Sequence, residues 1–393
     1  MASLSEKGRR NGSPRLDGFR NVVVIGSRKS ELALKQTYHV KQLLEEVHEG
    51  KGITFVVKTS STVGDDFLDV PLATLARKES GIFAKTLEIG LESGVYDFAV
   101  HSLKDMPTTL PQNLKLSAIL EREDPSDSLV VHNHFAGKCR VEGLKALPDG
   151  AVVGTSSVRR CAIIKRHFPK LHVRSIRGNL NTRLKKLDDS LPFPERKAVS
   201  TGLSENAVQQ HYDAIILATS GLKRMGWENR IEQLLPETLF PYAAGQGSLG
   251  IESRNSDKWI QSLLDAIIHP PSAFRCLAER SFLAGLQGGC QMPVGCSSSF
   301  DCESKVLHIA GYIFKHDGTK VIEASGTSVV NSLKEAAALG DKLATSVIGK
   351  GGSSLMQENE EVMSEAEQVT RVPLPAALRR PLTYSTVATD KKG

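Results

Sequence analysis

The apolar residues of this chain follow two patterns, short runs of β-branched residues and longer stretches with helical spacing. Residues 21–25 form a short run, and apolar positions between Leu32 and Val47 then recur every three or four residues. The same order of strand and helix returns at 151–167 and at 213–224. Strands that alternate with helices predict an α/β fold with largely parallel sheets.

The last third of the chain has a different order of elements: a helix, a hairpin of two strands and a second helix. Their expected ranges are 273–286, 305–314, 320–330 and 332–347. This order predicts a small C-terminal α+β domain.

Three segments show neither pattern. Residues 1–20 are polar and carry four arginines, and we expect a disordered extension, with organelle targeting left open. Residues 189–210 have no clear period and indicate a loop insertion. The segment after Gly349 is polar, and we expect a mobile tail there.

Length and composition set bounds on the class of protein. The chain has 393 residues, more than one hydrophobic core usually holds, so two or three domains are expected. No run of 18 apolar residues occurs, so no membrane partner is expected. Six scattered cysteines without a Cys-x-x-Cys pair indicate reduced thiols, a cytoplasmic location and no metal site.

Arginines follow the strand ends at three places. The three segments are Gly26-Ser-Arg28-Lys-Ser30, Thr155-Ser-Ser-Val-Arg159-Arg160 and Arg177-Gly-Asn-Leu-Asn-Thr-Arg183. A cation in the first turn of a helix is unfavourable by about a few tenths of a kcal/mol. Because this conflict recurs, it indicates a ligand with several carboxylates or phosphates, held at the carboxyl ends of the strands. Arginines spread over the surface without a function are the alternative.

A second group of polar residues follows the apolar strand that ends at Val100. His101, Ser102, Lys104 and Asp105 come at once, and Pro107 stops the element. A carboxylate among many cations should carry its negative charge. Asp105 is therefore suited to stabilise a positive charge on a ligand rather than to donate a proton. A solvated surface turn is the alternative.

One cysteine stands apart from the other five. Cys290 follows Gly288-Gly289 at the end of an expected helix, so we expect it on a tight, exposed turn. A thiol in such a place is a candidate nucleophile or attachment point. A structural cysteine is the alternative.

Six segments together resemble the porphobilinogen deaminase family, also called hydroxymethylbilane synthases. They are Gly26–Ala33, Val100–Pro107, Gly154–Arg160, Ser175–Arg183, Ala243–Gly250 and Gly288–Val294, in the order of the family. The resemblance implies two periplasmic-binding-protein-like, doubly wound α/β domains and a small C-terminal α+β domain. It divides the chain into 1–20 as an extension, 21–120 with 243–268 as domain 1, 121–242 as domain 2 and 270–393 as domain 3.

The resemblance also implies the chemistry. The family joins four porphobilinogen molecules head to tail, with loss of ammonia, into linear hydroxymethylbilane, using a covalent dipyrromethane cofactor. Acetate and propionate arms on every pyrrole fit an arginine-lined cleft, and Asp105 can stabilise the azafulvene that forms when ammonia leaves. A monomer acting on a small molecule, without nucleic acid, is the expectation.

The roles of the family carry over to this chain by position. Asp105 becomes the catalytic carboxylate, and Cys290 becomes the thioether attachment point of the cofactor. The expected cofactor-binding residues are Lys104, Ser102, Arg159, Arg160, Ser156, Arg183 and Gln246, and the expected substrate-binding residues are Arg28, Ser30 and Arg177.

Two other classes of function remain as alternatives. A two-domain receptor for an anionic ligand would have no use for the Gly-Gly-Cys290 segment. A nucleic-acid-binding protein would need aromatic residues among its arginines, and aromatic residues make up only 5% of the chain. The residues favour the enzyme.

Overall fold

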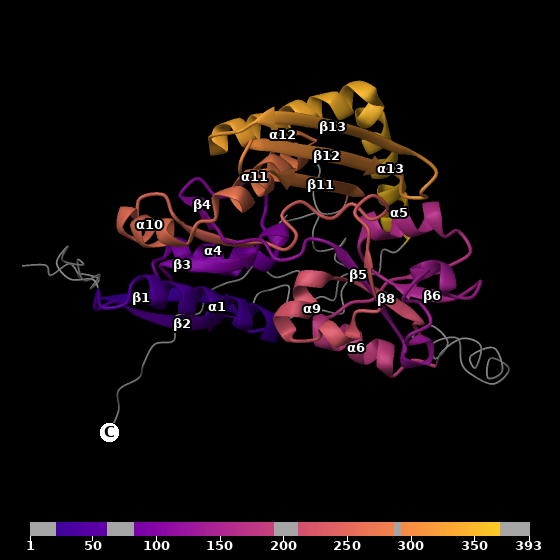
Figure 1. Ribbon diagram of the computed structural model, residues 1–393, viewed down its shortest axis with the longest axis horizontal. Helices are drawn as coiled ribbons and strands as arrows, with labels where there is room; N and C mark the ends of the chain where they lie inside the picture. Colours follow the sequence, from indigo (N-terminus) through magenta and orange to yellow (C-terminus); the bar gives the residue numbers. More distant parts are fainter. Residues whose placement is uncertain (1–20, 61–81, 192–210, 287–291, 370–393) are drawn as a thin grey trace, which may run out of the picture.

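The computed structural model describes residues 21–60, 82–191, 211–286 and 292–369. Within these ranges, two five-stranded sheets and one three-stranded sheet form three parts, which we call the first lobe, the second lobe and the C-terminal unit (Figure 1). Helices pack against every sheet, so the predicted α/β class with a small α+β unit is confirmed. No helix among the described residues is long and apolar enough to cross a membrane.

The first lobe has the strand order β2-β1-β3-β10-β4. Its elements are β1 (Val22–Arg28), α1 (Glu31–Val47), β2 (Thr54–Ser60), α4 (Ile82–Glu92), β3 (Phe98–Ser102), the 3₁₀ turn η1 (Leu103–Asp105), β4 (Leu114–Ile119), β10 (Leu249–Arg254), α10 (Lys258–Leu264) and η5 (Asp265–Ile267). Leu44 of α1 and Ile260 of α10 pack on one face of the sheet, whereas Leu87 and Leu91 of α4 pack on the other. Helices on both faces bury the strands, which explains their nearly continuous apolar runs.

The second lobe repeats this plan with the strand order β7-β6-β8-β5-β9. Its elements are β5 (Asp127–Val131), η2 (Asn133–Phe135), η3 (Gly143–Ala146), β6 (Val152–Gly154), α5 (Val158–His167), β7 (His172–Arg174), α6 (Leu180–Asp188), β8 (Ala214–Ala218), α9 (Thr219–Met225), η4 (Glu228–Arg230) and β9 (Gln233–Leu235). Ile163 of α5 belongs to the core on one face, and Leu184 of α6 and Leu222 of α9 belong to the core on the other.

One strand in each lobe runs against its four companions. In the first lobe β10 is antiparallel to both β3 and β4, and in the second lobe β5 is antiparallel to both β8 and β9. Both reversed strands begin just after the chain has crossed from one lobe to the other. The prediction of largely parallel sheets is therefore correct, and the two exceptions mark the crossings.

The C-terminal unit is an antiparallel sheet in the order β11-β12-β13 with helices packed against it. Its elements are α11 (Pro270–Gly285), β11 (Val294–Phe300), β12 (Val306–Phe314), β13 (Val321–Val329), α12 (Leu333–Val347), the π-turn η6 (Ile348–Gly352) and α13 (Ser353–Val369). The hairpin and the first two helices confirm the prediction. The edge strand β11 was not predicted, because three serines in a row hide its apolar face.

The expectation of a mobile tail after Gly349 does not hold for residues 353–369, which form the helix α13. Leu355 is fully buried in the core of the C-terminal unit. Asn359 is also buried, and its side chain accepts a hydrogen bond from the His316 amide and donates one to the Phe314 carbonyl, each at 2.9 Å. Two inward residues, together with the partly buried Met356, anchor a helix whose sequence is mostly polar. Residues 1–20 and most of the insertion at 189–210 lie outside the described residues.

Candidate functional site

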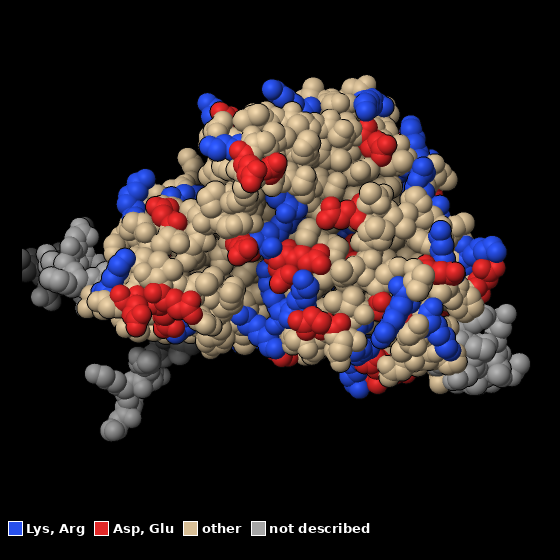
Figure 2. All heavy atoms as spheres, in the orientation of Figure 1, with Lys and Arg blue, Asp and Glu red and all other residues tan. Residues whose placement is uncertain are grey.

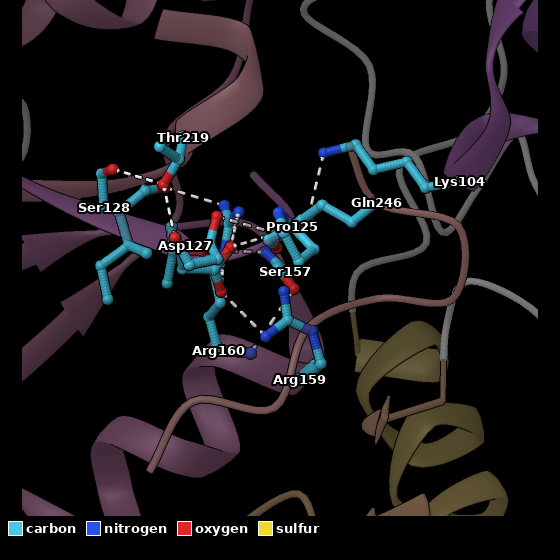
Figure 3. Close-up of polar contacts among 12 residues, drawn as sticks. Lys104, Pro125, Asp127, Ser128, Ser157, Arg159, Arg160, Thr219 and Gln246 are labelled. Atoms are coloured by element: carbon cyan, nitrogen blue, oxygen red, sulfur yellow. Dashed lines mark hydrogen bonds and ion pairs between the residues drawn. The ribbon is translucent and has the colours of Figure 1, made fainter. Parts of the chain in front are cut away.

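The two crossings between the lobes meet at Gln246, whose side chain is almost fully buried. Its amide nitrogen donates to the carbonyl of Pro125 at 2.7 Å and to the Asp127 carboxylate at 2.8 Å. Its amide oxygen accepts a hydrogen bond of 3.3 Å from the Lys104 ammonium (Figure 3). Gln246 of the return crossing therefore holds together the outgoing crossing and the turn that follows β3.

Asp127 at the start of β5 lies between two arginines of α5 (Figure 3). Arg160 contacts both carboxylate oxygens, through Nη2 at 2.7 Å and Nε at 3.1 Å, and Arg159 adds a contact of 2.9 Å through Nη1. All three side chains are buried. Burial alone would raise the pKa of Asp127, but the two guanidinium groups outweigh it and hold that pKa well below its ordinary value.

The ion triad of Asp127, Arg159 and Arg160 supplies, from within the protein, the negative charge that two arginines in the first turn of α5 require. The sequence predicted that arginines at this helix start would meet an external anion, yet the first anion they meet is Asp127. Arg160 also donates Nη1 to the Ile216 carbonyl at 2.8 Å, so its three nitrogens all bond within the protein. Arg159 bonds within the described chain through Nη1 alone, to Asp127 and to the Pro241 carbonyl.

Lys104 and Asp105 lie together in η1, directly after β3. Asp105 is exposed, whereas Lys104 is partly buried. Burial and the charges of Arg160 and Arg159 lower the pKa of Lys104, Asp105 and Asp127 oppose the shift, and the net pKa is about 8. A lysine is thus held beside the triad, and one accessible carboxylate stands next to it in the chain.

Arg183 belongs to the same electrostatic cluster. Burial and the charges of Arg160 and Arg177 lower the pKa of Arg183, Asp105 opposes the shift, and the net pKa is about 10. Its Nε donates to the Gly178 carbonyl at 2.9 Å, which fixes the side chain across the first turn of α6. Burial also lowers the pKa of Arg177. The start of α6 therefore faces the turn that carries Asp105.

The remaining predicted polar residues occupy the other strand ends. Ser30 is the residue before α1, and its hydroxyl does not cap the helix. Glu31 accepts a hydrogen bond of 2.7 Å from Asn181 of α6, which brings the Arg28–Ser30 turn to the opposite lobe. Ser102 bonds to Gln36 at 3.1 Å.

Two of the three helix starts that carry arginines lie in the second lobe, and each has a side-chain cap. Ser157 rather than Ser156 caps α5, by accepting from the Arg160 amide, and Asn179 caps α6. Ser156 instead donates to the Ile176 carbonyl at 2.7 Å. Its hydroxyl therefore tethers the α5 turn to the segment that leads into α6.

A second buried ion pair joins the crossings to the C-terminal unit. Arg122 binds Glu279 of α11 with both terminal nitrogens, at 2.6 and 3.0 Å, and donates Nε to the Gln246 carbonyl at 2.8 Å. Glu279 also accepts from the Gly245 amide at 2.8 Å. The crossings are therefore fixed to α11 on one side and to Lys104 and Asp127 on the other.

Seen from outside, the waist of the molecule is charged. Figure 2 shows basic side chains in a column between the lobes and beneath the C-terminal unit, with acidic side chains beside them. Among the described residues, no group of three or more His, Cys, Asp or Glu side chains could hold a metal ion.

Sequence reasoning missed Asp127, Arg122 and Glu279. Asp127 carried one usable signal, an acid two residues before the apolar run Leu129–Val131, because an acid at the start of a buried strand is itself buried and needs a cation. Arg122 and Glu279 are far apart in the chain, and nothing local pairs them. Cys290 lies outside the described residues.

Comparisons with known proteins agree with this architecture. The model of the porphobilinogen deaminase dipyromethane cofactor binding domain matches residues 23–262, and that of the porphobilinogen deaminase C-terminal domain matches residues 273–349. A porphobilinogen deaminase from Nostoc sp. is 43% identical over 337 residues, covering 86% of this chain and 94% of the relative. One from Dictyostelium discoideum is 40% identical, covering 86% and 97%.

A solved structure, the periplasmic VFT2 domain of BvgS from Bordetella pertussis, has 14% identity and a TM-score of 0.34. It covers 63% of this chain and 86% of that one.

Fold and site together define a two-lobed α/β enzyme with a cationic site at the junction of its lobes. The chain belongs to the porphobilinogen deaminase family. Members of this family are hydroxymethylbilane synthases, transferases of tetrapyrrole and haem biosynthesis that join four porphobilinogen molecules on a dipyrromethane cofactor. The resemblance and the activity expected from the sequence are confirmed.

Proposed function

We propose that Asp105 is the catalytic carboxylate of this synthase. The observation that carries the proposal is its position: an exposed carboxylate in η1, electrostatically coupled to Lys104 and Arg183. When ammonia leaves porphobilinogen, the carbon that bore it becomes electron-poor, and an anion fixed nearby stabilises that charge. Asp105 acts as this anion, while the neighbouring cations hold the acid arms of the substrate away from it.

The side chains around Asp105 fit a dipyrromethane cofactor. Its acetate and propionate arms need cationic donors, and Lys104, Arg183 and the remaining nitrogens of Arg159 supply them. When bound, the cofactor supplies the pyrrole carbon on which the product chain grows. Arg160 acts through Asp127, which it holds in place, and Gln246 sets the position of the Lys104 ammonium.

The substrate site lies on the opposing strand ends in this proposal. Arg28 and Ser30 from the first lobe and Arg177 from the second lobe bind the acid arms of the incoming porphobilinogen. The contact between Glu31 and Asn181 supports this arrangement, because it holds those two turns against each other.

Several further assignments rest on the family and on the sequence. We propose Cys290 as the thioether attachment point, with Ser102 and Ser156 as polar neighbours of the cofactor. Domain 1 comprises 21–120 with 243–268, domain 2 comprises 121–242 and domain 3 begins at 270. The enzyme acts as a cytoplasmic monomer without nucleic acid or a membrane surface.

Replacing the carboxylate tests the catalytic role. Asp105→Asn keeps the shape of the side chain but removes its charge, so turnover of porphobilinogen should fall by about 10²-fold or more. The thermal stability should stay close to that of the wild type, because Asp105 is exposed. Asp149→Asn is the control, since Asp149 is an exposed partner of Lys170 far from η1 in the chain. Turnover of Asp105→Asn equal to that of the control would refute the assignment.

A further inference from the structure

The turn that carries Lys104 and Asp105 is held from behind by one side chain of the C-terminal unit. Arg280 of α11 donates Nη2 to the Pro107 carbonyl at 2.6 Å and Nη1 to the Met106 carbonyl at 3.2 Å. Nη1 also lies 3.4 Å from the Leu103 carbonyl. These acceptors stand on both sides of Lys104 and Asp105 in the chain. A single guanidinium group therefore brackets the proposed catalytic pair.

This guanidinium group is buried, with about 8% of the residue exposed. Burial lowers the pKa of Arg280, while Cys276 and Glu252 oppose the shift. Burying a guanidinium group on backbone carbonyls costs desolvation energy that an apolar residue would not cost. A stable core alone does not call for such a residue here. Its planar fork is suited to fixing several carbonyls of one turn in a set geometry.

The packing around η1 supports the same conclusion. Leu103 and Met106 are buried against Ala273 and Cys276 on the face of α11 that also carries Arg280. The Leu103 amide donates to the Ser248 carbonyl at 3.0 Å on the return crossing. The apolar contacts set the distance between α11 and the turn, and the hydrogen bonds from Arg280 add directional restraints on its carbonyls.

We propose that Arg280 is a positioning residue, which fixes the backbone of residues 103–107 and thereby holds the Asp105 carboxylate where the reaction needs it. This inference rests on the catalytic role proposed above for Asp105. The proposal also gives the C-terminal unit a function, because its helix α11 aligns the turn of the first lobe that carries Asp105. Its neighbour Glu279 meanwhile holds the crossings through Arg122.

Arg280→Met keeps the apolar stem and removes the hydrogen bonds. We expect kcat to fall by about 10- to 100-fold with KM for porphobilinogen changed less than about two-fold, because a misplaced carboxylate affects the transition state more than binding. Arg275→Met is the matched control on the same helix, since Arg275 donates to Ser298 and does not touch the turn. It should keep the wild-type kcat. An unchanged kcat in Arg280→Met would overturn the proposal.

Two further measurements separate positioning from general stability. Amide hydrogen exchange in residues 103–107 should become about tenfold faster in Arg280→Met, with β12 unchanged. In the Asp105→Asn background, Arg280→Met should cause little further loss of turnover, because the group that it positions is already gone. A full additional loss in that background, or unchanged exchange in the turn, would contradict the proposal.

Arg280→Lys covers the case in which the methionine variant does not fold. Lysine keeps the charge but reaches fewer carbonyls, so we expect an intermediate kcat and intermediate exchange in the turn. Wild-type kcat with wild-type exchange in Arg280→Lys would overturn the role of the fork. If Asp105→Asn is active, the proposed catalytic role fails. If Asp105→Asn is inactive but every Arg280 variant is normal, only the positioning role fails.

Discussion

At the scale of single residues, Lys104 shows how this site balances charge. Its ammonium is surrounded by protein and stands near Arg159 and Arg160, so burial lowers its pKa to about 8 from an ordinary value of 10.5. The hydrogen bond to Gln246 offsets little of the desolvation energy of the ammonium, because a neutral amide is a weak partner for a charge. An anionic cofactor would supply a stronger partner for the ammonium, which agrees with the cofactor-binding role proposed for Lys104.

The lowered pKa of Lys104 should make the stability of the cofactor-free protein depend on pH, and such protein can be prepared from a host that makes no porphobilinogen. Because the pKa of Lys104 is lower in the folded chain, the unfolded chain binds more protons between about pH 8 and 10.5, and the free energy of unfolding rises with pH there. Relative to Lys104→Met, the wild type should gain about 1–2 kcal/mol between about pH 7.5 and 10. Urea unfolding measures the difference. Parallel pH curves for the two proteins would refute it.

The same scale shows what the sequence could and could not predict. Lys104, Asp105, Arg177 and Arg183 were predicted as site residues because each follows the end of a strand, where ligands bind in α/β sheets. The triad partner Asp127 was not found, because its pairing depends on the antiparallel strand β5, and no local pattern announces that reversal. Arg280 lies in the helix predicted over 273–286, but the sequence assigned it no role, since its acceptors are backbone carbonyls, which have no signature in the sequence.

At the scale of elements, α5 carries two arginines in the turn where a helix least tolerates cations. Arg159 and Arg160 are accommodated because Asp127 of β5 is buried between them. The triad ties the first turn of α5 to the start of β5 and, through Gln246, to the return crossing. The starts of α5 and β5 are thus held together by a buried ionic cluster as well as by apolar packing.

Removing the Asp127 carboxylate should destabilise the contact between α5, β5 and the return crossing. Asp127→Asn leaves two buried guanidinium groups without a counter-charge, so we expect a loss of about 3–5 kcal/mol in the free energy of unfolding. Denaturant unfolding at neutral pH provides the measurement. The control Asp189→Asn alters an exposed pair with Lys185 and should change stability by less than about 1 kcal/mol. A loss no larger than that of the control would contradict the structural role of the triad.

The prediction of elements succeeded where one pattern dominated. Helix α1 and strands β1 and β3 have clear periodicity, and the structure places each within a few residues of its expected range. Helix α13 was missed because only two of its described positions, Leu355 and Asn359, are fully buried, too few to make an apolar stripe. Burial of Asn359 depends on carbonyl and amide groups of the β12–β13 turn, which a sequence does not place.

At the scale of the whole molecule, the reversed strands β5 and β10 explain why the site lies where it does. Each lobe is completed by a strand that enters from the other lobe, so both crossings pass the carboxyl ends of the parallel strands. Gln246, Arg122 and Glu279 join these crossings to α11 of the C-terminal unit. All three parts therefore meet around the turn with Lys104 and Asp105, which suits an enzyme that must hold a growing polyanionic chain.

The central claim is that this chain builds its product on a dipyrromethane cofactor attached to Cys290. Intact mass spectrometry of the purified native protein beside Cys290→Ser tests it most directly, with both expressed in a host that makes porphobilinogen. We predict an added mass of two pyrrole units on the native protein and none on the variant. An unmodified native chain, or the same added mass on Cys290→Ser, would contradict the account.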